Sequence, residues 1–541
     1  MKKKKVILVF LFLLLLFGAY YIYIPAISIH SMDLWVFVLF ILVLVQVVYA
    51  GRHLLLGKLN QVGRRQWKTN QKIDLFSDKF MKIGRWITLG VFLVFVLGIF
   101  WSSSIINAKR YQKILSVEKR NFTEDIAPAQ FDNIPLLDRE SAIKLGNRKM
   151  GSMVDMVSQF EVSSLYSQIN YKGKPVRVTP LVYANTIKWL TNRKEGIPAY
   201  IMIDMATEDT SLVKLDKGIK YSKSEPLNRN IYRHLRFKYP TYIFDQISFE
   251  IDDEGTPFWV CPVKKYTVGW FGGPSIGRVV LCNAVTGQVQ DYPIEKCPKW
   301  VDKAYPADLL IRLYDYHGTL KNGYLNSILG QKGCLVTTDG YNYIAMDDDV
   351  WVYTGITSVS GDLSNVGFVL INQRTKECRY YEVNGAEEYS AMESAQGQVQ
   401  HLKYKATFPL LINVGGEPAY FMALKDKAGL VKKYALVNVE KYQNVSIGDT
   451  VLESQKDYLA KNAGGKNESE DLIQTKTGKI KRIAQSVVDG NSHFYVSLEN
   501  GEEIFDIPVT EFIEIVTYSE GDEITIEYAP NSPLCLVYDI K

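Results

Sequence analysis

The chain has 541 residues, a net charge of +5 and 22% charged residues. Its length exceeds the roughly 100–200 residues of one typical domain, so several folding units are expected. The nearly balanced charge gives no global basic field, which excludes nucleic acid as an expected partner.

Three apolar stretches predict a membrane domain over residues 1–106. Val6–Ile24, Leu34–Ala50 and Trp86–Ile106 each lack a charged residue and approach the ~20 residues that span a hydrocarbon core. A signal peptide is the alternative for the first stretch, because Lys2–Lys5 precede it. Its long apolar region, the missing A-x-A-like site and the second span that follows directly argue against cleavage. Spans without ionisable residues count against a transporter and favour anchoring or packing against a partner.

The distribution of Lys and Arg predicts the orientation in the membrane. Residues 51–85 are rich in both residue types, as is the amino terminus, whereas the loop between the first two spans has neither. We therefore expect a cell-membrane protein with a cytoplasmic amino terminus and with everything after about Ile106 outside the cell. The basic residues Lys109, Arg110 and Lys113 oppose this assignment only weakly.

Six cysteines fall in the predicted exterior part of the chain. None forms a C-x-x-C pair, so a zinc site has no support. An even number outside the cell permits disulfides, but their scattered apolar contexts favour buried thiols. The six are Cys261, Cys282, Cys297, Cys334, Cys378 and Cys535.

Residues 107–138 are predicted to form a stalk. The stretch is charged and ends in "EDIAPAQFDNIPLLD", whose prolines break regular structure.

Two short patterns recur beyond the stalk. Gly-x-Pro steps lead into predicted strands at Gly173, Gly196, Gly255 and Gly416, and Gly340 is a proline-free relative. Apolar strands end in an acid or amide at Asp204, Asn283, Asn372 and Asn438. Such a side chain opens a type I turn, and Gly287 suits the left-handed position that closes it. Glu208 and Lys376 stand there in two other copies, at a cost of about 1 kcal/mol, which predicts a different turn type for them.

Helical patterns alternate with these hairpins. They cover residues 138–157, 226–240, 305–317 and 384–402. A spacing of roughly 65–90 residues is too long for a solenoid and predicts tandem α+β modules. We therefore expect an α+β fold with four αββ units, at 139–225, 226–300, 301–382 and 383–460.

A helix followed by "GTPFWVCPV" and a strand ending "NAVTGQVQDY" resembles the PepSY-type module of protease propeptides and bacterial membrane proteins. The resemblance covers two to four units between about 139 and 445 and is best at 228–293. It implies non-catalytic, often regulatory or interaction domains. The chain is also similar to multi-span envelope proteins of Gram-positive bacteria concerned with cell shape. The residues of the PepSY resemblance are Gly255, Pro257, Trp259, Asn283, Thr286 and Gly287.

The last segment is predicted to be a separate domain. Residues 461–479 are polar and contain Gly, as in a linker. Residues 480–541 alternate as strands do, with turn residues at Asp489–Asn491 and Asn500–Gly501. They predict a five-stranded barrel of OB or SH3-like size.

Two serines imitate catalytic motifs. "GPSIG" has the G-x-S-x-G spelling around Ser275, but a strand follows where a helix is needed, so Gly272–Gly277 are interpreted as a flexible hairpin loop. Ser141 and Lys144 form S-x-x-K, and Lys476–Gly478 form K-T-G, as in penicillin-recognising enzymes. Ser141 sits where a helix would begin, a common place for serine, and Lys476 falls in the predicted linker.

Asp347, Asp348 and Asp349 are the best candidates for a metal site. Their carboxylates suit a hard cation, but on a strand at most two converge, and no D-x-D-x-D-G spacing is present. A solvated turn is the alternative. The six histidines form no H-E-x-x-H or H-x-H pair, so we expect neither a metal nor another cofactor.

Aromatic residues near loops are the remaining unusual feature. Such residues more often pack in cores and cross-strand pairs, but they also form contact surfaces. The candidates for a binding surface are Trp270, Phe271, Trp351 and Tyr353.

Together these patterns predict a membrane-anchored, non-catalytic extracytoplasmic scaffold or interaction protein of a bacterial envelope. Its partners would be the lipid bilayer and either envelope proteins or a second copy docked at sheet edges. The alternatives are a serine enzyme acting on wall peptide or glycan, and an accessory subunit that restrains a peptidase or membrane complex.

Overall fold

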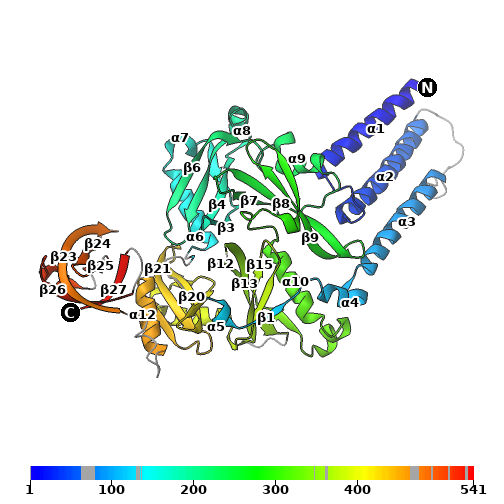
Figure 1. Ribbon diagram of the computed structural model, residues 1–541. Coiled ribbons are helices and arrows are strands. Elements are labelled where there is room, and N and C mark those ends of the chain that lie inside the picture. The colour runs from blue at the N-terminus through cyan, green and yellow to red at the C-terminus, as the bar shows by residue number, and fades with distance from the viewer. Residues whose placement is uncertain are drawn as a thin grey trace.

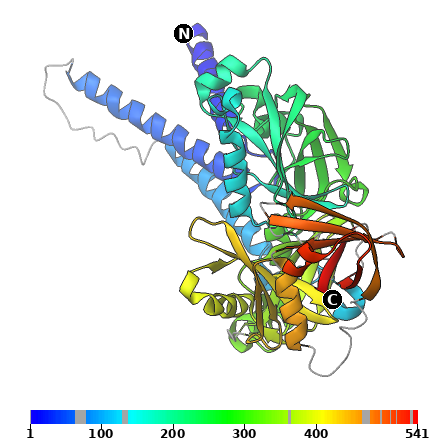
Figure 2. The same cartoon turned by 90° about the vertical axis from the view of Figure 1, so that its left-hand side faces the viewer.

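The computed structural model describes residues 2–62, 79–128, 135, 137–346, 348–359, 364–462, 474–488, 491–501, 503–509, 512–529 and 534–541. It is a mixed helix and sheet structure in which three amino-terminal helices extend from a body of four larger sheets and one two-stranded sheet (Figures 1 and 2). A smaller unit of strands lies at the carboxyl terminus, away from the three helices (Figure 1).

The extended helices are α1 (Lys2–Tyr23), α2 (Met32–Val62) and α3 (Lys79–Trp101). Two stretches, Met32–Gly51 and Lys79–Trp101, are long and apolar enough to cross a membrane, whereas the apolar stretch found in α1, Leu13–Tyr23, is shorter.

Inside this pair of helices, the amide of Gln46 donates a 2.7 Å hydrogen bond to the hydroxyl of Thr88, a polar contact that joins α2 to α3. Helix α3 ends at Trp101 and not at the predicted Ile106, because the chain turns at Ser102 and Ser103 before α4 (Ser104–Gln112) begins.

Each predicted αββ interval contains at least one helix and contributes four or five strands to one sheet, which is more than the two strands expected. Unit 1 (residues 139–225) has helix α6 and a sheet ordered β2-β4-β5-β6, with β3 also on β4. Its elements are α6 (Arg139–Gly151), α7 (Val154–Val157), β2 (Phe160–Val162), β3 (Ser167–Tyr171), β4 (Lys174–Tyr183), α8 (Thr186–Asn192), β5 (Ile197–Asp204) and β6 (Thr210–Ile219).

Unit 2 (226–300) has helix α9 and a sheet ordered β10-β9-β8-β7. Its elements are η2 (Leu227–Arg229), α9 (Ile231–Lys238), β7 (Ser248–Ile251), β8 (Pro257–Val268), β9 (Gly272–Asn283), β10 (Val289–Pro293) and η3 (Ile294–Lys296).

Unit 3 (301–382) pairs β11 and β12 with β13, then β15 and β16. Its elements are α10 (Ala307–Thr319), η4 (Asn326–Gly330), β11 (Leu335–Thr337), β12 (Asn342–Met346), β13 (Asp349–Ser358), β14 (Ser364–Asn365), β15 (Gly367–Asn372) and β16 (Cys378–Tyr381).

Unit 4 (383–460) has a sheet ordered β18-β20-β21-β22, with β19 also on β20. Its elements are β17 (Gly385–Ala386), α11 (Glu388–Gln398), η5 (Gln400–Leu402), β18 (Lys405–Ala406), β19 (Leu410–Val414), β20 (Glu417–Lys425), β21 (Val431–Asn438), β22 (Val445–Gly448) and α12 (Val451–Asn462).

The same side-chain turn follows the next-to-last strand that each unit contributes to its sheet. The side-chain oxygens of Asp204, Asn283, Asn372 and Asn438 each accept hydrogen bonds from the backbone N–H groups two and three residues later. Glu208, Gly287 and Lys376 all adopt positive φ, at 63°, 74° and 67°. The expectation of different turn types at Glu208 and Lys376 was therefore wrong, because the side-chain hydrogen bonds hold the left-handed residue in place without a glycine.

Neighbouring units share their hydrophobic cores. In unit 2, Trp259 and Cys261 face a core built with unit 1, whereas Val260 and Leu281 face a core built with unit 3. Strand side chains alternate between faces, so this sheet is buried on both sides. A further core lies between units 3 and 4. The units are therefore packed layers of one body.

The predicted stalk, residues 107–138, is described at 107–128, 135, 137 and 138, and parts of it pack against the body. Strand β1 (Glu118–Arg120) pairs in parallel with β16 and extends the sheet of unit 3. Leu115 and Phe122 are buried, and the hydroxyl of Tyr381 donates to the carboxylate of Asp125 at the end of α5 (Phe122–Asp125). Residues 118–125 therefore pack against unit 3.

The terminal segment consists of five strands, whose pairings β23-β24-β25-β27-β26 close on themselves. Its first strand begins at Gln474, inside the predicted linker, and α12 continues to Asn462; residues 463–473 and the turn at 489–490 lie outside the described residues. The elements are β23 (Gln474–Val488), β24 (Asn491–Leu498), β25 (Ile504–Pro508), η6 (Ile513–Thr517), β26 (Glu523–Ala529) and β27 (Leu534–Ile540).

Candidate functional site

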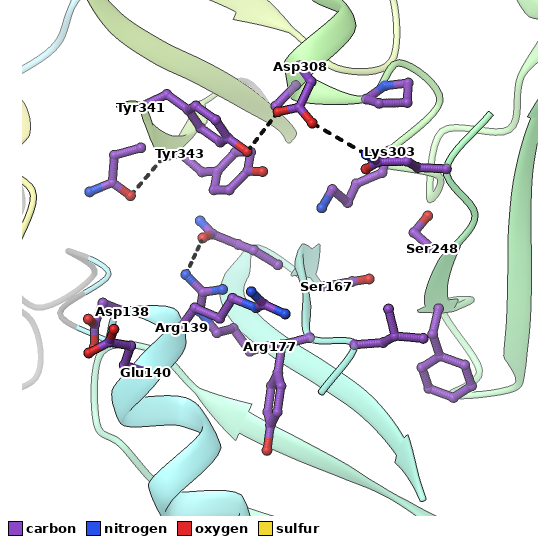
Figure 3. A pocket seen from close by; sticks show the side chains of 18 of the residues that line it. Asp138, Arg139, Glu140, Ser167, Arg177, Ser248, Lys303, Asp308, Tyr341 and Tyr343 are labelled. Carbon is purple, nitrogen blue, oxygen red and sulfur yellow. Dashed lines mark hydrogen bonds between the residues drawn. The ribbon is translucent and has the colours of Figure 1, made fainter. Parts of the chain in front are cut away.

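A cavity of about 500 Å³, here named the junction pocket, lies where the four units meet. Unit 1 contributes Arg139, Gln168 and Arg177, and unit 3 contributes Lys303 and Tyr343. Phe249 of unit 2 and Phe408 of unit 4 also line the cavity. Figure 3 shows Lys303 projecting toward the space that Arg139 and Arg177 approach from the opposite wall.

Sheet geometry positions the side chains of the unit 1 wall. Gln168 on β3 and Arg177 on β4 are cross-strand partners, so their side chains stand on the same face of the sheet. Arg139 is the first residue of α6, whose N-cap is Asp138. The opposite wall is built from the segment before α10, which holds Lys303, and from β12, which holds Tyr343.

Arg177 is a buried cation without a carboxylate partner in the described part of the chain. Its side chain is only 6% exposed. Its Nε donates to the carbonyl of Leu137 and its Nη2 to the Oε1 of Gln168, both at 3.3 Å. Burial lowers the pKa of this guanidinium to about 10. The charge is therefore held by neutral acceptors alone.

Lys303 is a second cation of the pocket and is partly buried. Its Nζ lies over the ring of Tyr343, 5.3 Å from the centroid, and makes no hydrogen bond or ion pair with any described residue. Burial lowers the pKa of this lysine, and the carboxylate of Glu250 only partly opposes that shift. A nearby anion would therefore stabilise its charged form.

Gln168 adds a free donor to the pocket. Arginine has no acceptor, so its hydrogen bond fixes Oε1 of Gln168 toward Arg177 and turns Nε2 away. This Nε2 is buried and has no hydrogen-bond partner. A buried donor without an acceptor costs about 1–3 kcal/mol, which a bound acceptor would relieve.

Two of the three acidic residues that line the pocket, Asp138 and Asp308, have partners, whereas the third, Glu140, is exposed and forms no hydrogen bond or ion pair with a described residue. Asp138 pairs with the Nζ of Lys425 at 2.6 Å, and Asp308 accepts from the hydroxyl of Tyr341 at 3.3 Å and from Gln246. Figure 3 shows the contact between Tyr341 and Asp308 at the top of the cavity. The pocket can therefore offer positive charge and donors to a ligand.

Ser141 and Lys144 occupy structural positions on α6. Asp138, and not Ser141, caps the helix and accepts from the backbone N–H of Ser141. The Ser141 hydroxyl is buried, 3.4 Å from the Nζ of Lys425, whereas Lys144 donates to the carbonyl of Ala428 at 2.6 Å. The two side chains thus have separate partners.

The other two motifs that resemble catalytic ones, around Ser275 and Lys476, lie in strands. Ser275 is buried within β9 and lies opposite Lys265, so Gly272–Gly277 are strand and not the expected loop. A nucleophile elbow requires a strand-to-helix turn, which this position lacks. Lys476 lies on β23, paired with Glu503 at 2.7 Å, and not in a linker.

The aspartate triplet separates into different roles. Asp347 lies outside the described residues. Asp348 is exposed at a turn with φ of 64° and accepts from the amide of Asn170 at 3.0 Å. Asp349 is buried and pairs with Arg374, which corrects the alternative of a solvated turn for this residue. Among the described residues, no group of three or more His, Cys, Asp or Glu side chains could hold a metal ion.

Trp351 and Tyr353 do not form a binding surface. They are 1% and 0% exposed, because β13 turns these alternate side chains into the core between units 3 and 4. The hydroxyl of Tyr353 donates to the buried carboxylate of Glu388 at 3.0 Å.

Trp270 and Phe271 contact this chain's own amino-terminal helices. They form the tip of the β8–β9 hairpin, where Trp270 stacks on Trp35 of α2 and Phe271 meets Phe95 of α3 edge to face, 5.6 Å between centroids. These side chains therefore form a packing contact between the hairpin tip and the amino-terminal helices, and they do not form a free surface.

Backbone groups of the hairpin tip also form hydrogen bonds across this contact. The Ser102 hydroxyl accepts from the backbone N–H groups of Trp270 at 2.8 Å and Phe271 at 3.0 Å, and it donates to the carbonyl of Gly98 at 2.6 Å. The Nδ1–H of His30 donates to the carbonyl of Trp270 at 2.7 Å. The hairpin tip is thus tied to the ends of α2 and α3.

The residues of the junction pocket were not predicted from the sequence. Arg177 gave one usable signal, since it interrupts the apolar strand "KPVRVTPLVY", where a cation is expected to be buried. Lys303 and Gln168 gave none, because only the packing of units 1 and 3 brings them together. All six cysteines are free thiols, as their apolar contexts predicted.

The fold and pocket define an α+β chain with apolar amino-terminal helices attached to a layered body. No protein-family model matches this chain, and no curated protein matches its sequence.

Proposed function

We propose that this chain is a membrane-anchored, non-catalytic scaffold of a bacterial envelope, whose body lies outside the cell and binds protein partners or a second copy. The observation that supports the proposal is the packing of Trp270 and Phe271 against α2 and α3. It holds a large folded body directly on helices suited to a bilayer, as an anchored scaffold requires.

The proposed topology has three spans, with α1 as the first. The guanidinium of Arg236 donates to the carbonyl of Ile24 at 3.0 Å, and the backbone N–H of Ile27 donates to the carbonyl of Pro240. These contacts hold the loop between α1 and α2 against unit 2. The Lys- and Arg-rich residues 51–85 join the opposite ends of α2 and α3, which supports a cytoplasmic location for that loop.

We further propose that the four units are PepSY-like modules and that the terminal strands form an OB or SH3-like domain. The presence in each unit of a helix and a sheet with four or five of the unit's own strands, together with the same side-chain turn, supports the first part. Such modules imply interaction rather than catalysis.

Strand β6 is the proposed docking place for a partner strand. It is ten residues long, lies at the end of its sheet and has exposed residues along its length. An unpaired strand edge presents backbone donors and acceptors to another chain.

Photo-crosslinking in native membranes tests this proposal. A benzophenone amino acid at Asp216, an exposed residue of β6, should capture a membrane or envelope protein or a second copy. The matched control is Asp155, which is also exposed but lies on α7. Equal capture at both positions, or none at Asp216, would remove β6 as the docking strand.

A serine-directed label addresses the enzyme alternative. Because Ser275 and Ser141 are buried in structural positions, a fluorophosphonate or penicillin analogue should leave the chain unmodified. A mass gain that disappears in Ser275→Ala or Ser141→Ala would favour an enzyme acting on wall peptide or glycan. An accessory subunit would instead co-purify with one membrane protein in fixed proportion.

A further inference from the structure

We propose that the junction pocket binds a small organic molecule through an oxyanion group, phosphate or carboxylate, held by Arg177, Lys303 and Gln168. The inference does not depend on the scaffold role, because it rests on the pocket alone.

The positive charge of the pocket is the first feature that favours an anionic ligand. The buried Arg177 and the partly buried Lys303 face one cavity from opposite walls, and neither forms an ion pair with a carboxylate in the described part of the chain (Figure 3). Burying an unpaired charge is costly, and buried charges in proteins are normally paired. An oxyanion between them would supply the missing partner.

The second step is hydrogen bonding. The orphaned Nε2 of Gln168 is fixed beside Arg177 by the hydrogen bond between their side chains. A planar guanidinium with an adjacent amide N–H matches the several acceptor oxygens of phosphate or carboxylate. These donors favour an anion over a neutral apolar ligand.

The third step is size and lining. A volume of about 500 Å³ falls within the range of small-molecule sites, and a bare inorganic ion would leave most of it empty. Phe249, Phe408 and Tyr343 provide apolar wall for the rest of a ligand. Arg139, exposed at the pocket rim, adds positive charge that attracts an anion.

The location gives such a ligand a structural consequence. Arg177 belongs to unit 1 and Lys303 to unit 3, so an anion that contacts both would join the two units. Binding to the folded state alone raises its stability in proportion to RT ln(1 + [L]/Kd). The ligand should therefore stabilise the packing of the body.

The test measures thermal unfolding and calorimetric binding of the full chain in detergent micelles. The probes are inorganic phosphate, phenyl phosphate and benzoate, each against sodium chloride at equal ionic strength. We expect saturable stabilisation, stronger with phenyl phosphate than with inorganic phosphate. Comparison of phenyl phosphate with benzoate distinguishes a phosphate from a carboxylate head group.

Lys303→Met is the decisive variant. Its Nζ makes no hydrogen bond with a described residue, so the variant should still fold without ligand and should bind about tenfold more weakly or worse. Lys299→Met, an exposed lysine on the same segment, is the matched control and should bind normally. Arg139→Ala, a second variant at the rim, should weaken binding several-fold.

Three results would overturn the inference. They are no saturable effect of any of the three probes, unchanged affinity in Lys303→Met, and equal losses in Lys303→Met and Lys299→Met.

Discussion

The indole ring of Trp270, at the tip of a hairpin in unit 2, stacks on that of Trp35 at the start of α2, with 5.8 Å between centroids and 16° between planes. Beside this pair, Gly98 of α3 leaves room for the hairpin. A Cβ atom at Gly98 would lie 2.7 Å from the Trp270 ring and 2.9 Å from the Phe271 ring. The body and the amino-terminal helices therefore meet in a close contact that one side chain could disturb.

Gly98→Leu should weaken this contact. Overpacking a filled site costs about 1–3 kcal/mol, because neighbouring rings must leave their preferred positions. The measurement is the denaturant midpoint of the full chain in micelles, together with protease sensitivity of the β8–β9 tip. Gly90→Leu is the control, since no atom lies within 4 Å of its Cβ position. Equal effects of the two substitutions would contradict the close packing of the hairpin tip against α3 at Gly98.

Asp349→Asn should destabilise the body. The carboxylate of Asp349 accepts from Nε and Nη2 of Arg374, both at 2.6 Å, and from the amide of Asn372 at 2.8 Å. Breaking a buried ion pair costs about 3–5 kcal/mol, and the partial exposure of Arg374 favours the lower end. Asp348→Asn, at the exposed turn, should cost far less.

The same measurement with calcium or with a chelator should leave the unfolding midpoint unchanged. A rise with calcium that Asp349→Asn abolishes would restore the metal hypothesis.

Tyr353→Phe should lower the free energy of unfolding by about 1–3 kcal/mol, because the buried carboxylate of Glu388 loses one of its donors. The other donors to Glu388 are Thr338 and Asn365, at 3.1 and 3.3 Å. Tyr442→Phe, on a residue 41% exposed, should be nearly neutral in the same unfolding experiment. Loss of partner capture in Tyr353→Phe without loss of stability would instead support a surface role.

Asp302 should make stability depend on pH. Burial raises the pKa of its carboxyl well above the ordinary value, and the nearby Glu250 carboxylate adds to the shift. The folded state therefore binds this proton more tightly than the unfolded state does. The resulting stabilisation is complete below the unfolded pKa, about 4, and is lost as pH rises through the folded pKa.

Unfolding midpoints of the parent chain and of Asp302→Asn, measured from pH 4 to 8, test this dependence. The advantage of the parent over the variant should shrink as pH rises. An advantage that stays constant or grows would show that Asp302 is ionised in the folded chain.

Glu208→Gly should raise the free energy of unfolding by up to about 1 kcal/mol. Glu208 has a φ of 63°, where an L-residue is strained and glycine is not. The control is Glu161→Gly in strand β2, which should destabilise by about 0.5–1 kcal/mol because the added backbone freedom is lost on folding. A destabilised Glu208→Gly chain would indicate that the side chain contributes more than its backbone strain costs.

The amino-acid sequence by itself determined the local geometry of this protein. Gly287 has positive φ, as its place in the turn predicted. The five glycines that begin the Gly-x-Pro steps or their relative also have positive φ; these are Gly173, Gly196, Gly255, Gly340 and Gly416. The four side-chain turns form where the sequence placed them, and two apolar helices suited to a membrane lie near the amino terminus. Turns and helices depend on hydrogen bonds between residues a few positions apart, so a short stretch contains the information.

Only the tertiary structure decided which face of each strand is buried and which distant residues meet. Trp351 and Tyr353 had the composition of a contact surface, but unit 4 covers their side of β13. Residues 107–138 had the composition of a stalk, but β1, which lies within them, pairs with β16 at the edge of the sheet of unit 3. Arg177 and Lys303 line one cavity although more than a hundred positions separate them, because the packing of whole sheets, and not local pattern, sets such distances.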